Sequence, residues 1–386
     1  MSNRKTTSIR QYIGTSPMVK RAVAGFKISR AVSIGDWLFT NGQMDIGAEA
    51  KVLNPGDIVA QTVTCMRSVY ELVARTDYRL ADLAQLQVFY LGDSVVNETS
   101  YRKMILEEFP ECRDTLLVMT RVPSFATVGH EVEIDAIAVS GQRACVRNDT
   151  GMVRGVRRGD WVFANSRVRY DATDVCDDLC ATLGKLDAHS RDVCRLYVYY
   201  SAELSPQERA RIERNIAQYF HGVPATYHAA IVPGNATPDF AVELEVIANS
   251  SSTAEKAAYG CAVAPAGEVE WPFVDALCCA DLVFTSGQFP LDATGAVQHP
   301  TDIANQSRVV MRRLAATLNR AGVDTGDLVK IKTYFEGAWN LDNWLDNLNA
   351  RMESLSDPGP ASTGIEGLSP VVAGALLSVD GIASRK

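Results

Sequence analysis

The sequence predicts an α+β protein made of three tandem units, each with the element order β-β-α-β-α-β. Three observations support this class: a strand signature occurs three times, a helix start with an aspartate follows each copy, and an alternating strand closes each copy. Self-similarity along a chain is the mark of repeat architectures. The 386 residues therefore divide into expected units at 1–142, 143–252 and 253–386, each of ordinary domain size.

The first element of each unit is the strand signature. It reads GDWLFTNGQ at residues 35–43, GDWVFANSR at 159–167 and ADLVFTSGQ at 280–288. Aromatic and β-branched residues bounded by turn residues are typical of a strand. The first and third copies are closely similar, whereas the second has diverged.

A helix is expected after each signature. Asp57, Asp174 and Asp302 each begin a pattern of the form D-[I/V]-x-x-[Q/D], and apolar residues recur at helical spacing in the first and third copies. An aspartate at the start of a helix accepts hydrogen bonds from free backbone N–H groups and complements the helix dipole. The three aspartates are therefore expected in a cap or first turn.

The remaining elements follow in the same order in each unit. A strand rich in β-branched and aromatic residues comes next, followed by a second amphipathic helix such as residues 343–352 and a closing strand in which apolar and polar residues alternate. Polar stretches at 140–150 and 249–268 are expected linkers. The inner strands are expected at 86–91, 196–200 and 331–335, and the closing strands at 132–139, 242–248 and 377–383.

Composition excludes several classes of function. The net charge is −8 and no long basic tract occurs, which disfavours binding to nucleic acid. No apolar run approaches the ~20 residues of a membrane span, and the polar N-terminus does not resemble a secretion signal. Nine cysteines without a CxxC pair are expected to be reduced thiols of a cytoplasmic protein. No phosphate-binding loop or HExxH helix occurs, so neither a cofactor nor a metal is expected.

The segment LVFTSGQFPLDATG (282–295), the helix starts and the strand EVEIDAIAV (131–139) together resemble the RidA family, also called YjgF or UK114. The resemblance implies chorismate-mutase-like domains that assemble as homotrimers, with a ligand cleft at each subunit interface. Three such units on one chain imply a covalent pseudo-trimer, either monomeric or a dimer, with sheets inside and helices outside. The activity implied is cofactor-free hydrolysis of 2-imino or 2-enamino acids to 2-keto acids and ammonia.

The resemblance also implies site residues in copy one. The family carries an Arg at the start of the penultimate strand, a Cys or Thr two residues later and a Glu on the final strand; the counterparts are Arg113, Thr115 and Glu133. Arg113 would hold a substrate carboxylate through both oxygens, and Glu133 would position water and carry a proton. The alternative for Arg113 is a surface ion pair with Asp114.

Copies two and three depart from the family pattern. In copy two Thr226 replaces the Arg, while His228 and Glu243, expected on adjacent strands, form a candidate general base. A purely structural His228 is the alternative. Copy three lacks both the Arg and the Glu, so one complete cleft is expected where copy one meets a neighbour, for which copy three is favoured. The catalytic candidates are Glu133, Thr115, His228 and Glu243, and the substrate-binding candidates are Arg113, Asn41, Phe273, Ser286, Gly287 and Asn349.

Three functional hypotheses remain open at this point. The first is a hydrolase of a small, carboxylate-bearing imine or enamine. The second is a diverged, pathway-specific enzyme that acts on a larger substrate. The bond it cleaves is a C–N bond or an enol ether, the latter because the resemblance extends distantly to chorismatases, which hydrolyse an enol ether. The third is a non-catalytic ligand-binding protein, because fold alone does not determine function. Each hypothesis implies a small-molecule partner, and none implies nucleic acid or membrane.

Overall fold

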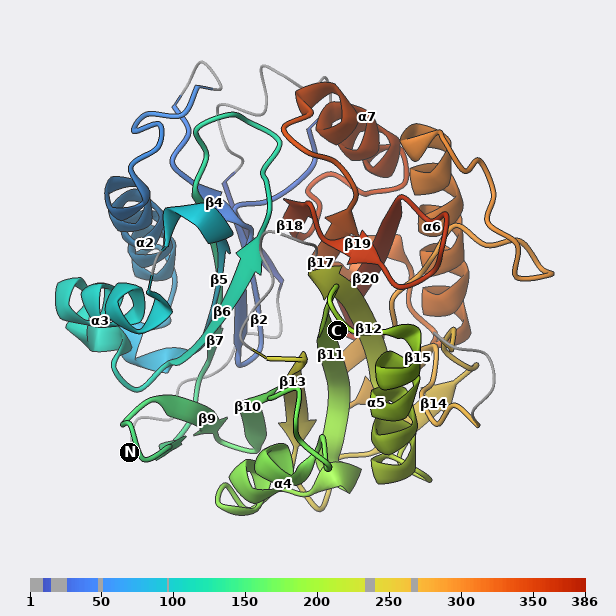
Figure 1. The fold of residues 1–386 in the computed structure, drawn as a ribbon, viewed down its shortest axis with the longest axis horizontal. Helices are drawn as coiled ribbons and strands as arrows, with labels where there is room; N and C mark the ends of the chain where they lie inside the picture. The colour runs from blue at the N-terminus through green and yellow to red at the C-terminus, as the bar shows by residue number, and fades with distance from the viewer. Residues whose placement is uncertain (1–9, 15–25, 48–50, 96, 233–239, 265–269) are drawn as a thin grey trace.

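The computed structural model describes residues 10–14, 26–47, 51–95, 97–232, 240–264 and 270–386. Three sheets face a common centre, and the helices lie mainly on the outside (Figure 1). The first third of the chain (blue to cyan), the middle (green) and the last third (orange to red) each form one sector. The predicted tandem α+β architecture is therefore confirmed.

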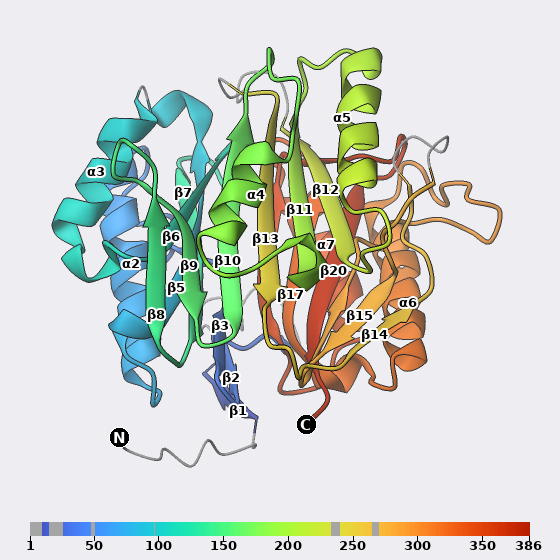
Figure 2. The ribbon, with the colours of Figure 1, turned by 90° about the horizontal axis from the view of Figure 1, so that it is seen from below.

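Unit one has the strand order β1-β2-β3-β7-β5-β6, with β4 paired to β7. Its helices α2 and α3 cover the outer face of this sheet (Figure 2). The bounds are β1 Gln11–Ile13, β2 Ala31–Ile34, β3 Trp37–Thr40, β4 Gln43–Met44, α2 Ile58–Ala74, β5 Leu83–Leu91, α3 Glu98–Glu108, β6 Leu116–Val122 and β7 Val132–Val139.

Unit two has the strand order β12-β11-β13-β10-β9-β8, and the short strand β19 of unit three pairs with the outer edge of β12. This pairing joins the backbones of units two and three. The bounds are β8 Arg143–Arg147, β9 Val153–Arg158, β10 Trp161–Val168, α4 Asp177–Gly184, β11 Val193–Ser201, α5 Pro206–Tyr219, β12 Thr226–Val232 and β13 Val242–Asn249.

Unit three has the strand order β14-β15-β16-β20-β17-β18. The bounds are β14 Lys256–Tyr259, β15 Ala276–Cys279, β16 Leu282–Thr285, α6 Ile303–Arg320, β17 Leu328–Phe335, α7 Leu341–Met352, β18 Ala361–Glu366, β19 Ser369–Pro370 and β20 Leu377–Ser384. Short 3₁₀ helices are η1 Leu80–Asp82, η2 Gly92–Ser94, η3 Pro110–Cys112, η4 Ser190–Asp192 and η6 Thr325–Asp327.

Three local expectations need correction. Each unit contains a strand beyond the predicted order, because β6, β12 and β18 pair in parallel with β5, β11 and β17 after the crossover through the second helix. Asp57 and Asp302 cap α2 and α6 as expected. Asp174 does not cap α4, since this helix begins at Asp177. The polar stretches expected as linkers contain the strands β8 and β14.

The signature strand does not pair with the closing strand in the same way in all three units, and this difference affects the space beside the closing strand. In unit one the register advances from Phe39–Ile137 to Gln43–Ile134, so one extra residue bulges out. Unit three has the same bulge after β16. Strand β10 instead pairs with β13 without interruption over its whole length. Side chains of a continuous strand alternate faces, whereas a bulge redirects the chain and opens space.

The units share a core at the centre of the molecule. Each unit also has its own core between sheet and helices. The shared core joins Trp37, Trp161 and Phe284 at one end of the sheets, and Phe89, Tyr199 and Tyr334 at another level. These contacts between units make the three sheets one packed body. Within the described ranges, no helix has the length and apolar character needed to cross a bilayer.

Candidate functional site

Equivalent polar residues meet at three interfaces between the units. The final strand of each unit faces the inner strand of a neighbour, and one acidic side chain of the final strand contacts a polar or charged partner there. We name these the one/three, two/three and one/two interfaces. The contacts are Asp135 with Lys330, Asp380 with Arg195, and Glu245 with Gln85, in that order.

Strand registers also define the counterparts of Glu133. Glu133 lies opposite Phe89, and in the other units the opposite pairs are Glu243 with Tyr199 and Ser378 with Tyr334. Glu133, Glu243 and Ser378 are therefore equivalent positions that face the three interfaces. Their surroundings differ, and the differences indicate what each interface can do.

At the one/three interface, Glu133 lines a cavity of about 40 Å³. Unit one contributes Phe125, Thr127 and His130, and unit three contributes Trp344 and Glu366, among others. Within the described part of the chain, the carboxyl of Glu133 makes no side-chain hydrogen bond. Burial raises its pKa to about 8, with a further contribution from Asp135, while Lys330 and Lys332 act in the opposite direction. Near neutral pH this side chain can therefore either donate or accept a proton.

The buried lysine next to Glu133 has its donors in use. Nζ of Lys330 donates to the carbonyl of Thr40 at 2.7 Å, to Oδ2 of Asp135 at 3.0 Å and to Oγ1 of Thr363 at 2.6 Å. Burial lowers the pKa of Lys330 to about 8, although Asp135 favours its charged form. An ammonium has three N–H donors, so Lys330 has none left for a substrate anion.

The opposite wall of the cavity carries a second carboxyl with a raised pKa. Glu366 is 2% exposed, and neither of its carboxyl oxygens has a hydrogen bond of ordinary length. Burial raises its pKa to about 7, against the effect of the backbone N–H groups of Asn340 and Trp339. His130 donates from Nε2 to the carbonyl of Val132 at 2.8 Å, and burial lowers its pKa to about 4. The cavity thus joins two protonatable carboxyls to a neutral histidine.

His228 occupies a place that the sequence did not predict. The expected pair with Glu243 is wrong, because β11 lies between β12 and β13 in the sheet. His228 instead reaches unit three across the two/three interface, where Nδ1 is 2.8 Å from Oδ1 of Asp380 and Nε2 is 2.9 Å from Oγ of Ser378. All three side chains are buried.

At the one/two interface, Glu243 is covered by neighbouring side chains. Asn165 donates to its Oε1 at 2.5 Å, and Nε of Arg167 lies 3.3 Å from the same oxygen. Nη1 of Arg167 also donates to Glu98 at 2.6 Å. Asn165 and Arg167 lie two residues apart on the uninterrupted strand β10, so both point to the same face. The structure therefore encloses Glu243 within an ion-pair network.

Arg113 and Thr115 are separated from Glu133. They line a cavity of about 530 Å³ on the unit-two side of unit one, together with Arg147 and Met152. The expectation that they share a cleft with Glu133 is therefore not met: strand β6 faces unit two, whereas β7 faces unit three. Arg113 is exposed, and it follows η3 rather than lying on the strand. The positions at the start of the penultimate strand are Leu116, Thr226 and Ala361, which pair with Gln85, Arg195 and Lys330.

The remaining candidates take part mainly in packing. Phe273 packs against Phe220 and Tyr227 of unit two. Oγ of Ser286 donates to the carbonyl of Val274 at 2.6 Å and accepts from the backbone N–H of Tyr227 at 2.8 Å. Gly287 lies against the ring of His228.

The two asparagines among the candidates lie outside the described lining of the one/three cavity. The side chain of Asn41 accepts a hydrogen bond from Gln43. Asn349 is exposed on α7, whereas Asn347 is buried and bonded to Ser307 and Arg351. Sequence reasoning missed the roles of Asp380 and Glu366. Ser378 and Asp380 have the same spacing as Glu133 and Asp135, and this spacing could have identified Asp380 as a site residue.

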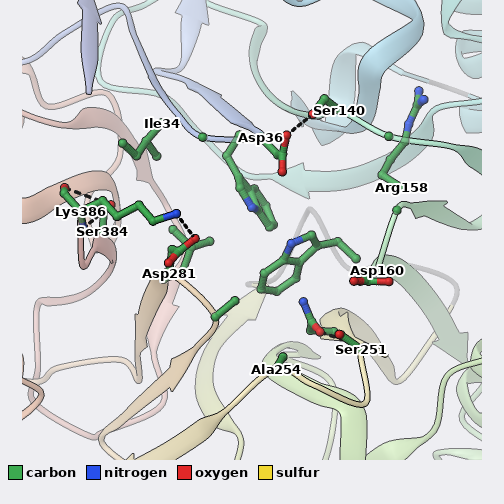
Figure 3. Close-up of a pocket in the computed structure, with 18 of the residues that line it drawn as sticks. Ile34, Asp36, Ser140, Arg158, Asp160, Ser251, Ala254, Asp281, Ser384 and Lys386 are labelled. Atoms are coloured by element: carbon green, nitrogen blue, oxygen red, sulfur yellow. Dashed lines mark hydrogen bonds and ion pairs between the residues drawn. The ribbon is translucent and has the colours of Figure 1, made fainter. Parts of the chain in front are cut away.

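A separate cavity of about 890 Å³ lies where the first hairpins of the three units converge. Figure 3 shows Asp36, Asp160 and Asp281, one from each hairpin turn, around this space. Asp36 accepts from Ser140, and Asp281 accepts from Nζ of Lys386, both at 2.5 Å. The described lining of this cavity of about 890 Å³ includes neither Glu133, Glu243 and Ser378 nor the acidic residues that contact a neighbouring unit. Within the described residues, no group of three or more His, Cys, Asp or Glu side chains is placed to hold a metal ion.

Comparisons with known proteins agree with this architecture. Residues 263–382 match the family model described as Endoribonuclease L-PSP. A RutC family protein of Haemophilus influenzae is 39% identical over 64 residues, which cover 16% of this chain and 48% of that protein. A putative reactive intermediate deaminase, TdcF, of Escherichia coli is 33% identical over 64 residues with the same coverage. The chain thus spans about half the length of these two relatives.

A solved chorismatase resembles the whole arrangement. It has a TM-score of 0.53 and 14% identity, and the likeness covers 79% of this chain and 93% of the chorismatase. At this identity the likeness shows the fold alone. The family match places residues 263–382 of unit three in the family of RidA/YjgF/UK114 proteins, and the related sequences support this recognition. The three-sheet fold shows units of the same kind in tandem along the chain.

Proposed function

We propose that this protein is a cofactor-independent hydrolase of a small imine or enamine, and that the reaction occurs in the one/three cavity. One observation carries the proposal: Glu133 opens into a cavity, has no hydrogen-bond partner among the described residues, and has a pKa raised to about 8. A catalytic acid or base is most effective when its pKa lies near the working pH. A name that refers to deaminase activity, given to a relative, supports the same reaction class.

The reaction needs one water and one proton carrier. Glu133 in its ionised form takes a proton from water as the water oxygen bonds to the imine carbon. The protonated carboxyl returns this proton to nitrogen, which gives a carbinolamine. Glu133 then takes the hydroxyl proton of the carbinolamine and passes it to nitrogen, so that the carbonyl group forms, the C–N bond breaks and ammonia leaves. A cavity of about 40 Å³ has space for about one water molecule next to Glu133. A substrate therefore needs the outer wall at Leu341 and Trp344 to shift, and Leu341 is already 46% exposed.

Charge around the cavity narrows the substrate class. Its described lining contains two carboxyls, Glu133 and Glu366, and neither a lysine nor an arginine. Lys330, next to Glu133, is fully bonded. The described lining itself offers a substrate carboxylate no cation, and Lys332, which acts on Glu133, lies outside this lining in an ion pair with Asp135 at 3.8 Å. A neutral or protonated imine would meet acceptors. The proposed substrate is therefore a neutral or cationic imine, in contrast to the carboxylate-bearing compound that the family resemblance implied.

The test measures ammonia release from two ketimines that differ in charge. An amine oxidase acting on 1-phenylethylamine supplies a neutral ketimine, and an amino-acid oxidase supplies 2-iminobutyrate. We expect faster release than the uncatalysed rate for the neutral compound, with a loss of about 100-fold or more in Glu133→Gln. Glu245→Gln, a buried carboxyl at the one/two interface, is the matched control and keeps the rate. An unchanged rate in Glu133→Gln would contradict the proposal.

A further inference from the structure

The two/three interface holds a serine, a histidine and an aspartate in direct contact. Ser378 and Asp380 are two residues apart on β20, so both side chains point to the same face of the strand. His228 reaches them from β12 of unit two, with Nδ1 at 2.8 Å from Oδ1 of Asp380 and Nε2 at 2.9 Å from Oγ of Ser378. Both distances are those of hydrogen bonds.

The charges around His228 determine its tautomer. Burial and the cations Arg195 and Lys332 lower the pKa of His228 well below its ordinary value, so the ring is neutral. Burial and the nearby Asp135 raise the pKa of Asp380, whereas contact with the guanidinium of Arg195 favours its ionised form. As a carboxylate, Asp380 can only accept hydrogen bonds. Nδ1 therefore carries the ring proton, and Nε2 presents a lone pair to the hydroxyl of Ser378. This is the tautomer of a general base next to a nucleophile.

Neighbouring residues hold this arrangement in place. The hydroxyl of Tyr197 lies 2.9 Å from both carboxylate oxygens of Asp380. The ring of His228 lies against Tyr334 and Tyr197, with centroids 5.1 and 5.5 Å apart. Gly287 lies on the imidazole, and a Cβ at that position would collide with the ring. The imidazole is therefore held in one orientation between its two partners.

The equivalent positions at the other interfaces do not form this set. His228 lies opposite Tyr197, and the counterparts of that pair are Thr363 opposite Lys332 and Val118 opposite Gln87. Thr363 donates to Asp135 at 2.7 Å, which leaves no base next to Glu133. Val118 has no polar group. At these equivalent positions of the described chain, the two/three interface alone places a hydroxyl, an imidazole and a carboxyl in direct hydrogen-bond contact.

We propose that Ser378, His228 and Asp380 form a second catalytic site, which hydrolyses small carboxylic esters through an acylated Ser378. Oγ of Ser378 bonds to the carbonyl carbon while its proton passes to Nε2 of His228. The C–O bond of the ester then breaks, and the leaving group takes that proton and departs as an alcohol. Water attacks the acyl carbon, gives one proton to Nε2, and releases the carboxylic acid as Ser378 recovers its proton. Asp380 positions the ring and stabilises the imidazolium.

The test uses the smallest practical acyl donor, because Ser378 is fully buried in this structure. The full-length protein is treated with p-nitrophenyl acetate, p-nitrophenol release is followed, and peptide mass spectrometry locates the acetyl group. We expect acetylation of Ser378, which is absent in Ser378→Ala. In His228→Gln the acetylation rate should fall by about 100-fold or more, since a general base contributes at least this factor.

A matched control separates catalysis from structure. Ser307 is a buried serine of the same unit that donates to the carbonyl of Ile303 at 2.7 Å and has no histidine partner. Ser307→Ala should keep the acetylation rate, and Ser378→Cys should keep acyl transfer at the same position. Thermal unfolding checks that each variant is folded. An unmodified Ser378 in wild-type protein, or an unchanged rate in His228→Gln, would show that the three residues only hold units two and three together.

Discussion

Glu133 and Glu243 occupy the same position in two copies of one strand, yet their environments are opposite. Glu133 lies beside Gly42, where the chain bulges, and opens into a cavity. Glu243 lies under Asn165 and Arg167 of an uninterrupted strand and is bonded to both. One extra residue in the neighbouring strand thus separates a buried carboxyl that lines a cavity from one that is covered by hydrogen-bonded side chains. A covalent pseudo-trimer can keep this difference, whereas a homotrimer repeats each change three times.

The largest expected effect on the free energy of unfolding comes from removing Arg167, which covers Glu243. Arg167→Ala leaves the buried Glu243 and the half-buried Glu98 without the cation that they share. Removing one partner of a buried ion pair costs about 3–5 kcal/mol. Urea unfolding should therefore show a loss of this size. The double variant Arg167→Met with Glu243→Gln should recover most of the lost stability. A loss below about 1 kcal/mol in Arg167→Ala would mean that the ion pair with Arg167 is not what stabilises the enclosed Glu243.

Filling the space beside Glu133 should lower stability by a smaller amount. A Cβ at Gly42 would overlap with the carboxyl of Glu133, so Gly42→Ala must displace that side chain. Overpacking of this kind costs about 1–3 kcal/mol, and imine hydrolysis should fall because the proton carrier has moved. Gly184→Ala is the control, since a Cβ there meets open space. Equal behaviour of the two variants in urea unfolding and ammonia release would contradict the role of Gly42.

The pH dependence of stability should show the protonated state of Glu133. Its pKa is about 8 in the folded protein, against an ordinary value of 4.5. Between these values the folded chain holds a proton that the unfolded chain has released. Stability therefore falls as pH rises through this window, by up to about 1.4 kcal/mol per pH unit. Wild type should lose stability relative to Glu133→Gln between pH 5 and 7.5 in urea unfolding.

His130 acts in the opposite direction within part of this window. Its pKa is lowered to about 4, from 6.5, so its contribution to stability rises with pH between these values. Both proteins retain His130, and its contribution therefore cancels in the difference between wild type and Glu133→Gln. Parallel stability curves for the two proteins would show that Glu133 is ionised in the folded state at these pH values.

Local patterns predicted the repeated elements well. The closing strand expected at 132–139 is β7, and the aspartates at 57 and 302 cap their helices. These features depend on neighbours in the sequence, such as alternation of apolar residues and free N–H groups in a first turn. The capping role of Asp174 was not confirmed because the helix of unit two is short and begins later.

Contacts between distant residues could not be predicted in the same way. His228 and Glu243 lie on strands that β11 separates, and the pairing order of strands is not encoded in any one segment. The family resemblance placed Arg113 at the start of the penultimate strand, although the strand itself begins later, at Leu116. The loss of one residue in the strand of unit two, which encloses Glu243, is visible in the sequence only once the registers are known.

The smallest expected effect concerns Arg113. The family resemblance assigned it to the substrate carboxylate, but it lines a different cavity from Glu133, at the side of unit one that faces unit two. It is exposed, and exposed substitutions usually change stability by about 0.5 kcal/mol or less. Arg113→Ala should therefore retain both stability and ammonia release from the neutral ketimine, within about twofold. The contrary outcome is a loss of 2-iminobutyrate hydrolysis in this variant with the neutral substrate unaffected. It would place a carboxylate-binding site in the cavity of about 530 Å³. The contrast between the surroundings of Glu133 and Glu243 would then not determine where substrate binds.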